Sequence, residues 1–594
     1  MIDLKEAAQK LFKLFTRREK KKLIMLFMMM IVAAILETAG IGLIAPFVGL
    51  VTNPEIIQEQ PILSYVYELL GFNSSTAFII FAVIMLLSVF VLKNLYLLLF
   101  NYAQFRVVLN QQVKLSRDLF KEYLTKPYAF HLQRNSADLL RNVNGEVSKV
   151  FQGIIISSFQ LFTELLIIFC IVSLLLVTAP VATLAASALL GGSVYIFFAV
   201  IRKKISRLGK EQQRVSGTMI QWVNQGLGAS KEVKVSGKES FFINSYTGQS
   251  QIKANNSRYM KMLEQAPRYF IETLLVSVVL ITMLIIVFQG TGTTELISTM
   301  ALFAMAAFRL MPSITRVVSL SATIRYSQPA LEVVYEDLIK SKQKEAGLVN
   351  KADTAIVNKG DRAFTDSISL NDVSFRYPDQ HELAVDGVSL TIPIGQSAAF
   401  VGESGAGKTT LVDIILGLFT PEKGNVLLDG ESIHSNKALW QQKIGYIPQF
   451  IFLSDDTIRG NVAFGIDQDK IDDQEVWRAL EQAQLKEFVE WLPDKLDTSV
   501  GEGGVRLSGG QRQRIGIARA LYNNPEILFM DEATSALDND TEKEIMKAID
   551  GLKGEKTLII IAHRLSTIEN CDLVFKINNG RLISTDQNLK RSVM

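Results

Sequence analysis

The sequence predicts an all-α transmembrane domain of six helices, fused to an α/β domain of the P-loop class. Three observations support this division. The first half of the chain holds six long apolar stretches, the second half alternates short apolar strands with helices, and a phosphate-loop pattern occupies residues 402–410. A hydrophobic content of 48% with only 20% charged residues also favours a membrane protein. At 594 residues the chain is too long for a single core.

Composition excludes several other classes. The 62 Lys and Arg residues nearly balance the 59 Asp and Glu residues, so charge gives no general case for nucleic-acid binding. The sequence contains two cysteines, far apart, and four scattered histidines, so neither a disulfide framework nor a zinc site is indicated. These residues are Cys170, Cys571, His131, His381, His434 and His563.

Residues 1–22 predict an amphipathic, basic helix. Its apolar face consists of Leu4, Ala8, Leu11, Phe12 and Phe15, and lysines and arginines supply the rest. We expect such a helix to lie on the inner membrane surface, and not to be removed as a signal peptide. The alternative is a solvated run of charge, which the apolar face disfavours.

A membrane domain is predicted over residues 23–330. A helix needs about 20 apolar residues to cross a bilayer, and six stretches qualify: 23–50, 77–100, 153–178, 180–201, 269–288 and 296–318. The connections 51–76 and 289–295 contain no Lys or Arg, whereas 101–152 and 202–268 are rich in both. By the positive-inside rule, both termini are expected in the cytoplasm, in a bacterial inner (plasma) membrane.

Shorter elements are expected between the spans. The two basic connections are patterned as helices, with breaks at 125–128 and 225–229 where short crosswise helices fit. Residues 61–71 carry apolar residues at helical spacing and predict an external amphipathic helix, the alternative being an ordered loop. A linker is expected over 331–365, and the α/β domain over 366–594.

The phosphate-loop pattern lies between a predicted strand, 397–401, and a predicted helix, 410–416. Glycines allow backbone N–H groups to close around an anion at the helix N-terminus. Lys408 is suited to neutralise outer phosphates, and the Thr409 hydroxyl is suited to bind Mg²⁺. A glycine-rich turn without function is the alternative, and the strand and helix around the pattern disfavour it.

Polar residues follow two further buried strands. Asp531 and Glu532 end an apolar strand, and His563 ends another. Functional groups gather at the carboxyl ends of parallel strands. We therefore expect Asp531 to hold Mg²⁺, Glu532 to orient or deprotonate a water, and His563 to reach the γ-phosphate. A purely structural histidine is the alternative for His563.

The stretch Leu507-Ser508-Gly509-Gly510-Gln511 precedes a predicted helix and offers a second anion-binding helix N-terminus. With this stretch, residues 370–580 resemble the nucleotide-binding domain of an ABC transporter, in which it is the signature sequence. The resemblance implies that Tyr377 stacks on adenine and that Gln449 contacts Mg²⁺ and takes part in catalysis with Glu532 and His563. It also implies that 498–503 contacts the crosswise helices and that 535–538 is a loop at the dimer seam.

The resemblance implies ATP and Mg²⁺ as cofactors. The expected Mg²⁺ ligands are Thr409, Gln449 and Asp531. The expected nucleotide-binding residues are Tyr377, Gly402, Glu403, Ser404, Gly405, Ala406, Gly407, Lys408, Thr409, Thr410, Ser508, Gly510 and Gln511. In this family each ATP lies between the phosphate loop of one subunit and the signature of the other, so a second copy of the chain is implied. All the motifs are intact, which favours a homodimer over a heterodimer.

Charges within the apolar stretches are the candidates for substrate contact, because a charge in hydrocarbon is costly. They are Arg309, Arg316, Glu37 and Lys93, with Glu164 also inside a stretch. An arginine suits a phosphate because its planar fork binds two oxygens. The alternative is that these charges pair with one another or lie in a wet cavity without touching substrate.

The membrane domain is similar to the lipid-linked oligosaccharide flippases. The matching stretches are 37–47, the external helix, 123–128 and 309–313. This resemblance implies an exporter that moves a lipid-linked glycan, or another membrane lipid, to the outer leaflet. A multidrug, lipid or peptide exporter remains an alternative. A further alternative is a soluble ABC ATPase that acts on nucleic acid, and the six predicted membrane spans disfavour it.

Overall fold

The structure is a computed structural model. It describes residues 4–587 except 44–46, 48, 52–53, 73, 179, 289–292, 341–363, 379, 532–538, 563–567 and 569–570. The chain divides into two compact units. A helical unit comprises Met1–Lys126 and Arg134–Ala346, and an α/β unit comprises Pro127–Gln133 and Gly347–Met594.

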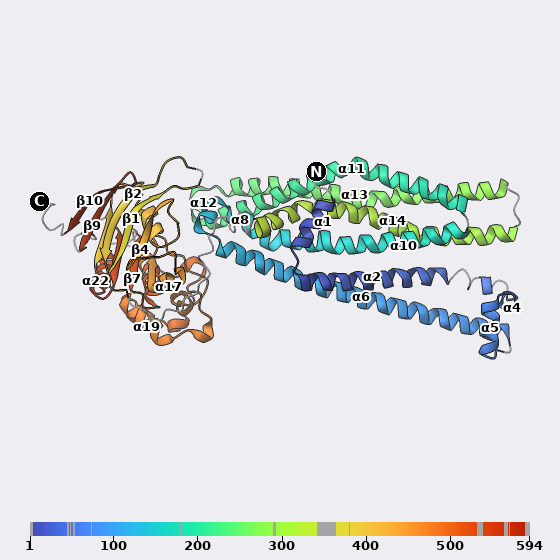
Figure 1. Cartoon of the computed structure of the whole chain (residues 1–594), viewed down its shortest axis with the longest axis horizontal. Coiled ribbons are helices and arrows are strands. Elements are labelled where there is room, and N and C mark those ends of the chain that lie inside the picture. Colours follow the sequence, from blue (N-terminus) through green and yellow to red (C-terminus); the bar gives the residue numbers. More distant parts are fainter. Residues whose placement is uncertain are drawn as a thin grey trace. The chain divides into compact units, whose positions relative to one another are not determined.

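The helical unit is built from long helices that run through the predicted apolar stretches (Figure 1). These helices are α2 Arg17–Gly42, α6 Ser75–Thr125, α10 Ser157–Thr178, α11 Pro180–Gly228, α13 Glu239–Phe288 and α14 Thr293–Tyr335. Among the described residues, three helical segments are long and apolar enough to cross a membrane: Arg17–Gly40, Ser75–Thr125 and Ser136–Ser173. The helices pack through buried aliphatic side chains such as Ile167 and Ile171 of α10 with Leu310 of α14.

The amphipathic segment predicted over 1–22 is divided in the structure. Helix α1 spans Leu4–Lys13, and α2 already begins at Arg17. The backbone N–H of Thr16 donates to the Glu19 carboxylate at 2.7 Å, and the Thr16 carbonyl accepts from Lys20 N at 3.0 Å. This arrangement begins a new helix, because the carboxylate satisfies a donor that the helix start leaves unpaired. The basic residues from Arg17 onward therefore extend the first long helix.

Short helices begin at the end of the first predicted break and directly after the second, although residues 225–228 of the second break still belong to α11. Helix α7 spans Tyr128–Gln133 and α12 spans Ser230–Ser236, where the two crosswise helices are expected. Helix α5, Pro61–Leu69, occupies the segment of the expected external helix and follows α4, Ile56–Glu59. Between α7 and α10 lie α8 Ser136–Arg141, η1 Asn142–Glu146, α9 Val147–Lys149 and η2 Val150–Ile156, of which η1 and η2 are π-helical.

The last membrane-domain helix is longer than predicted. Helix α14 continues to Tyr335, and the π-helical η3 follows over Glu336–Lys340. The first ten residues of the predicted linker, 331–340, are therefore helical. The rest of that linker falls largely on 341–363, outside the described residues.

The α/β unit contains two sheets. The first is antiparallel, with strand order β2-β1-β4-β5. Its strands are β1 Ser367–Phe375, β2 Val385–Pro393, β4 Lys423–Leu428 and β5 Glu431–Ser432. The alternation of strands and helices predicted from residue 366 does not hold for β1 and β2, which pair directly with each other.

The second sheet has the order β10-β9-β3-β8-β7-β6 and is parallel except for β10. Its strands are β3 Ser397–Val401, β6 Ile444–Ile447, β7 Ile527–Asp531, β8 Thr557–Ile561, β9 Leu573–Asn578 and β10 Arg581–Gln587. Asp531 is in register with Ile561, and Ile561 is in register with Phe400. The carboxyl ends of β3, β7 and β8 therefore meet at one edge of the sheet.

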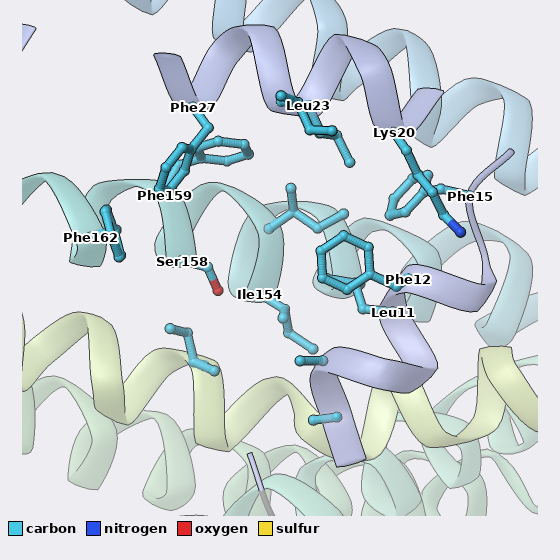
Figure 2. Close-up of a pocket in the computed structure, with 15 residues that line it drawn as sticks. Leu11, Phe12, Phe15, Lys20, Leu23, Phe27, Ile154, Ser158, Phe159 and Phe162 are labelled. Carbon is cyan, nitrogen blue, oxygen red and sulfur yellow. The ribbon is translucent and has the colours of Figure 1, made fainter. Parts of the chain in front are cut away.

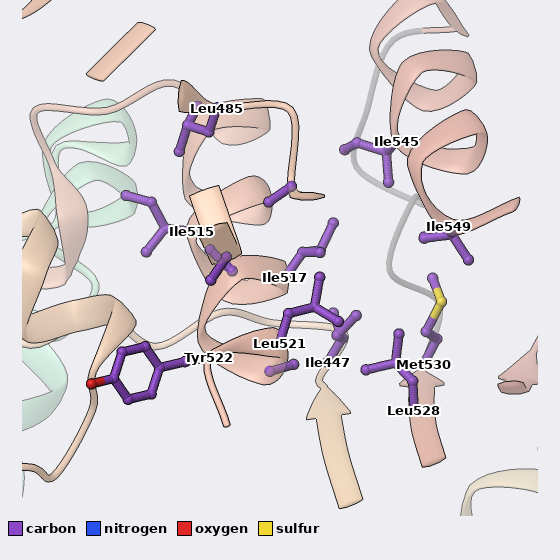
Figure 3. Packing of buried hydrophobic residues seen from close by; sticks show 14 of the residues in the cluster. Ile447, Leu485, Ile515, Ile517, Leu521, Tyr522, Leu528, Met530, Ile545 and Ile549 are labelled. Carbon is purple, nitrogen blue, oxygen red and sulfur yellow. The ribbon is translucent and has the colours of Figure 1, made fainter. Parts of the chain in front are cut away.

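The other helices of this unit are α16 Lys408–Ile415, α17 Lys437–Lys443, α18 Ile458–Val462, α19 Asp473–Gln482, α20 Lys486–Trp491, α21 Gly509–Leu521 and α22 Asn539–Asp550, with short 3₁₀ turns η4 Gln468–Lys470, η5 Lys495–Asp497 and η6 Glu502–Gly504. Figure 3 shows side chains of α21 facing those of β6 and β7 in a buried cluster. Ile517 and Leu521 of α21 pack in the same cluster as Leu528 and Met530 of β7. This packing fixes α21 against the strand that ends at Asp531.

Candidate functional site

The phosphate loop has a backbone that only glycine tolerates. It leaves β3 after Val401 and enters α16 at Lys408, with φ of 152° at Gly402, 82° at Gly405 and 99° at Gly407. A Cβ added to Gly407 would lie 2.5 Å from the Ala384 carbonyl oxygen, closer than side chains approach. The glycines therefore allow a tight loop at the N-terminus of α16, where backbone N–H groups and the helix dipole favour an anion.

Lys408 is held inside this loop. Its side chain is buried, and its Nζ donates to the carbonyl oxygens of Gly402 and Glu403, both at 2.9 Å. The structure therefore places the Lys408 side chain within the phosphate loop.

A pocket of about 420 Å³ opens at the loop, a volume in the range of small-molecule sites. Tyr377 lines one side, and its hydroxyl is 2.9 Å from the Thr410 Oγ1. The remaining lining residues are Gln380, Glu382, Leu383, Ala384, Ser404, Gly405, Gly407, Lys408, Thr409 and Thr410. The structure therefore places Tyr377 beside the loop residues predicted to bind phosphate, although the β1–β2 segment and the loop are separate in sequence.

Two acidic residues near the phosphate loop influence each other electrostatically. Asp531, at the end of β7, is buried, and Asp413 belongs to α16. Burial, and then the nearby charge of Asp531, raise the pKa of Asp413 to about 7. Sequence reasoning missed Asp413, although an acidic residue within the apolar run 411–415 was a usable signal. This edge of the sheet favours a cation.

Two of the three predicted Mg²⁺ ligands, Gln449 and Asp531, lie at or just after the carboxyl ends of neighbouring strands. Gln449 lies two residues after β6 and is half-buried, and β6 neighbours β7, which ends in Asp531. Among the described residues there is no group of three or more His, Cys, Asp or Glu side chains that could hold a metal alone. Protein sites usually bind Mg²⁺ through one or two carboxylates together with phosphate oxygens and water. Thr409, Gln449 and Asp531 are suitable donors for such a site.

The signature stretch forms a capped helix start. The Ser508 side chain accepts from Gln511 N at 3.2 Å, and the Gln511 side chain accepts from Ser508 N at 2.9 Å. This capping box begins the 13-residue helix α21. Ser508 is exposed, while Gly510 and Gln511 are half-buried. Within the described part of the chain, the pocket at the phosphate loop is lined without these residues.

Helix α7 belongs to the α/β unit and packs on it. The Tyr128 ring lies 5.7 Å from the Phe419 ring, between centroids, and Ala129 packs against the same hydrophobic cluster. Phe419 in turn lies 5.5 Å from the Tyr377 ring. Aromatic contacts thus connect the expected crosswise helix with the pocket, and no sequence pattern predicted the position of Phe419.

Some of the predicted site residues lie outside the part of the chain that the structure describes. Glu532 and His563 lie outside the described residues, as do 535–538, and so does the side chain of Arg309, although its backbone is helical. Arg316 Nε lies 2.9 Å from a Glu164 carboxylate oxygen, joining α14 to α10. This ion pair agrees with the alternative in which intramembrane charges pair with one another.

The other two candidate charges lie on α2 and α6. Glu37 is half-buried in α2. One turn further along α2, a Cβ on Gly40 would lie 3.4 Å from the Lys93 Cδ. The Lys93 Nζ lies 4.7 Å from the centre of the Phe90 ring. The structure therefore brings Lys93 to the same stretch of α2 as Glu37.

Comparison with known proteins supports one family. Residues 23–311 match the ABC transporter transmembrane region, and residues 385–535 match the ABC transporter domain. The chain is 33% identical over 476 residues to the ATP-dependent lipid A-core flippase of Cupriavidus pinatubonensis, covering 79% of this chain and 78% of the relative. It is 32% identical over 492 residues to the protein of that name from Saccharophagus degradans, covering 81% and 80%.

A solved structure has the same fold. The bacterial Atm1-family ABC exporter with ATP bound aligns with a TM-score of 0.74 at 22% identity, covering 96% of each chain. The chain therefore belongs to the ABC transporter family, as an integral membrane protein whose helical membrane domain is fused to an α/β ATP-binding domain that couples ATP hydrolysis to transport.

Proposed function

We propose that this protein is an ATP-driven flippase that moves a phosphate-bearing glycolipid, such as a lipid-linked oligosaccharide, from the cytoplasmic to the outer leaflet. The observation that carries the proposal is the match to lipid A-core flippases over about four-fifths of the chain. A lipid-linked oligosaccharide and a lipid A-core share an amphiphilic chemistry: sugars and anionic groups on apolar chains.

The proposed nucleotide site rests on the pocket at the phosphate loop. Tyr377 stacks on the base, Lys408 neutralises phosphate charge, and Thr409, Gln449 and Asp531 hold Mg²⁺. When bound there by these residues, Mg²⁺ would supply positive charge against the phosphate oxygens. Glu532 positions or deprotonates the attacking water, and His563 reaches the terminal phosphate.

The proposed assembly is a homodimer. Ser508 is exposed at the start of α21, with Gly510 and Gln511 half-buried beside it, and these residues would meet a nucleotide held by another subunit. Two copies then form two composite sites, and ATP closes the paired α/β domains. Helices α7 and α12 transmit the movement to six spans, with residues 498–503 and 535–538 at the contacts between domains and subunits.

The proposed orientation places both termini in the cytoplasm of a bacterial inner membrane, because the basic connections belong inside. Arg309 is the main candidate for binding the phosphate of the lipid. The secondary candidates are Arg316, Glu37 and Lys93. Of these, Arg316 already forms an ion pair with Glu164.

The proposal is tested by ATPase stimulation of the purified protein in nanodiscs. The panel comprises a lipid-linked oligosaccharide, a lipid A-core glycolipid, plain phospholipids, a hydrophobic cationic drug and an apolar peptide. Stimulation by the phosphate-bearing glycolipids alone is the expected result, and Lys408→Ala is the control that abolishes it. Stimulation by the drug or the peptide, with none by either glycolipid, would contradict the proposal.

A further inference from the structure

A second pocket lies in the helical unit, distant in sequence from the phosphate loop. Its volume is about 420 Å³, and it is enclosed by α1, the first turns of α2, η2, the start of α10 and one residue of α14. Figure 2 shows Phe12 and Leu11 of α1 facing Ile154 and Ser158 across it. Of its fifteen lining residues, only Lys20 and Ser158 are polar. The pocket is therefore an apolar chamber with one cationic group.

The walls of this pocket are fixed by contacts outside it. Lys10 of α1 lies 3.9 Å from the Glu332 carboxylate and 5.9 Å from the centre of the Tyr335 ring, both on α14. Between α1 and α2, the Phe15 ring packs edge to face on the Phe151 ring, with 6.2 Å between the ring centroids. These contacts hold α1 across the helices, so the pocket is part of the fold.

The mouth of the pocket is apolar and open. Phe12 is 55% exposed and Ile24 is 61% exposed, although both line the pocket. Exposed apolar side chains around a hollow are unfavourable in water and favourable beside hydrocarbon. The mouth is thus suited to lipid chains.

Lys20 supplies the charge at this mouth. The neighbouring acid, Glu19, is buried and forms an ion pair with Lys114. Within the described part of the chain, Lys20 forms no ion pair of its own, and Arg17, Arg18, Lys21 and Lys22 surround it in sequence. An uncompensated basic cluster beside an apolar pocket is complementary to an anionic headgroup on an apolar chain.

We infer that this pocket binds an acyl chain of an anionic phospholipid, with the phosphate against Lys20. The site is separate from the charges proposed to contact the transported lipid, and it does not depend on the identity of that lipid. Its occupant would fasten α1 and the start of α2 to η2 and α10, which lead from α7 into the membrane domain. Anionic lipid thereby stabilises the packing of α1 on the helices of the membrane domain.

The test uses the full-length protein in phosphatidylcholine nanodiscs that contain phosphatidylglycerol with a diazirine in one acyl chain. After illumination, labelled peptides are mapped by mass spectrometry. Labelling of residues 4–15 and 154–162 should exceed that of 80–92, an apolar segment of α6 with exposed Ile84 and Leu87. Excess unlabelled phosphatidylglycerol should reduce it, whereas excess phosphatidylcholine should not.

Matched variants separate the pocket from general attraction to a charged surface. Lys20→Glu should reduce pocket labelling by about tenfold. Lys21→Glu alters an exposed neighbour that does not line the pocket, and it should reduce labelling by about threefold or less. Ala8→Trp should fill the pocket and remove labelling, while Gln9→Trp should not. Lys20→Ala serves as a milder second variant, because it removes the charge of half-buried Lys20 without introducing a negative one.

Three outcomes would overturn the inference. One is labelling of the pocket no stronger than that of 80–92. Another is an equal loss for Lys20→Glu and Lys21→Glu, which would indicate surface attraction without a site. The third is crosslinking of pocket residues to a second copy of the chain, which would assign this surface to a subunit interface. None of these bears on glycolipid transport, which is measured separately.

Discussion

Tyr377 faces the pocket at the phosphate loop, with its hydroxyl bonded to Thr410 at 2.9 Å. If its ring stacks on adenine, Tyr377→Ala should weaken ATP binding by about 5- to 150-fold, since base stacking contributes about 1–3 kcal/mol. Tyr377→Phe keeps the ring and loses only the hydrogen bond, so a change below about tenfold is expected. Equilibrium binding of a fluorescent ATP analogue measures the affinity of both variants. Unchanged affinity in Tyr377→Ala would exclude Tyr377 as a residue that contacts adenine.

Glu532 directly follows Asp531, the buried end of β7. Glu532→Gln should bind ATP but hydrolyse it about 10²- to 10⁴-fold more slowly, because a positioned general base contributes about that much. The protein should also accumulate as a closed, ATP-bound dimer, detectable by crosslinking. Turnover near the parental rate in purified Glu532→Gln would exclude Glu532 as the base.

Individual residues differ in how far the sequence could place them. Local patterns predict the positions of Lys408 and Asp531. Lys408 comes at the end of a glycine-rich loop, and Asp531 comes at the end of an apolar strand. The pairing of Arg316 with Glu164 could not be predicted, because helical periodicity does not determine which helices are neighbours. The raised pKa of Asp413 depends on its burial and then on the nearby charge of Asp531, and both come from tertiary packing that local sequence patterns do not reveal.

Among the helices and strands, α7 makes a contact whose role in coupling ATP hydrolysis to transport can be tested directly. Its Tyr128 packs on Phe419, and an aromatic pair contributes about 0.5–1.5 kcal/mol. Tyr128→Ala should lower ATP-driven transport several-fold while basal ATP hydrolysis stays within about twofold, because the loop pocket does not contain Tyr128. Leu132→Ala alters an exposed residue of the same helix and is the matched control. Equal losses of transport and hydrolysis in Tyr128→Ala would contradict a coupling role.

The elements show where sequence patterns suffice. The Lys126-Pro127 break correctly predicts the end of α6, since the residue before proline disfavours helix. The division of the N-terminal segment was missed, although Thr16 and Glu19 have capping-box spacing, because the apolar periodicity continues through Phe15. The antiparallel sheet was also missed, as local alternation does not reveal strand order.

For the whole molecule, the shared-site arrangement predicts complementation between inactive subunits. Ser508→Ala and Lys408→Ala should each be inactive alone, whereas a mixed dimer should retain one intact composite site. About half of the dimers formed from equal, randomly mixed subunits contain that site, so partial ATP-driven crosslinking is expected. A mixture no better than either parent at ATP binding would contradict the shared site.

The central claim is ATP-driven movement of a phosphate-bearing glycolipid, and the most direct measurement is flipping of a fluorescent lipid-linked oligosaccharide in proteoliposomes. The account predicts ATP-dependent flipping by the parent protein and none by Lys408→Ala. It also predicts near-normal basal ATP hydrolysis but no flipping in Arg309→Ala, with partial recovery in Arg309→Lys, which lacks the bidentate fork. If the parent protein hydrolyses ATP without moving this glycolipid or a lipid A-core glycolipid, the account is contradicted.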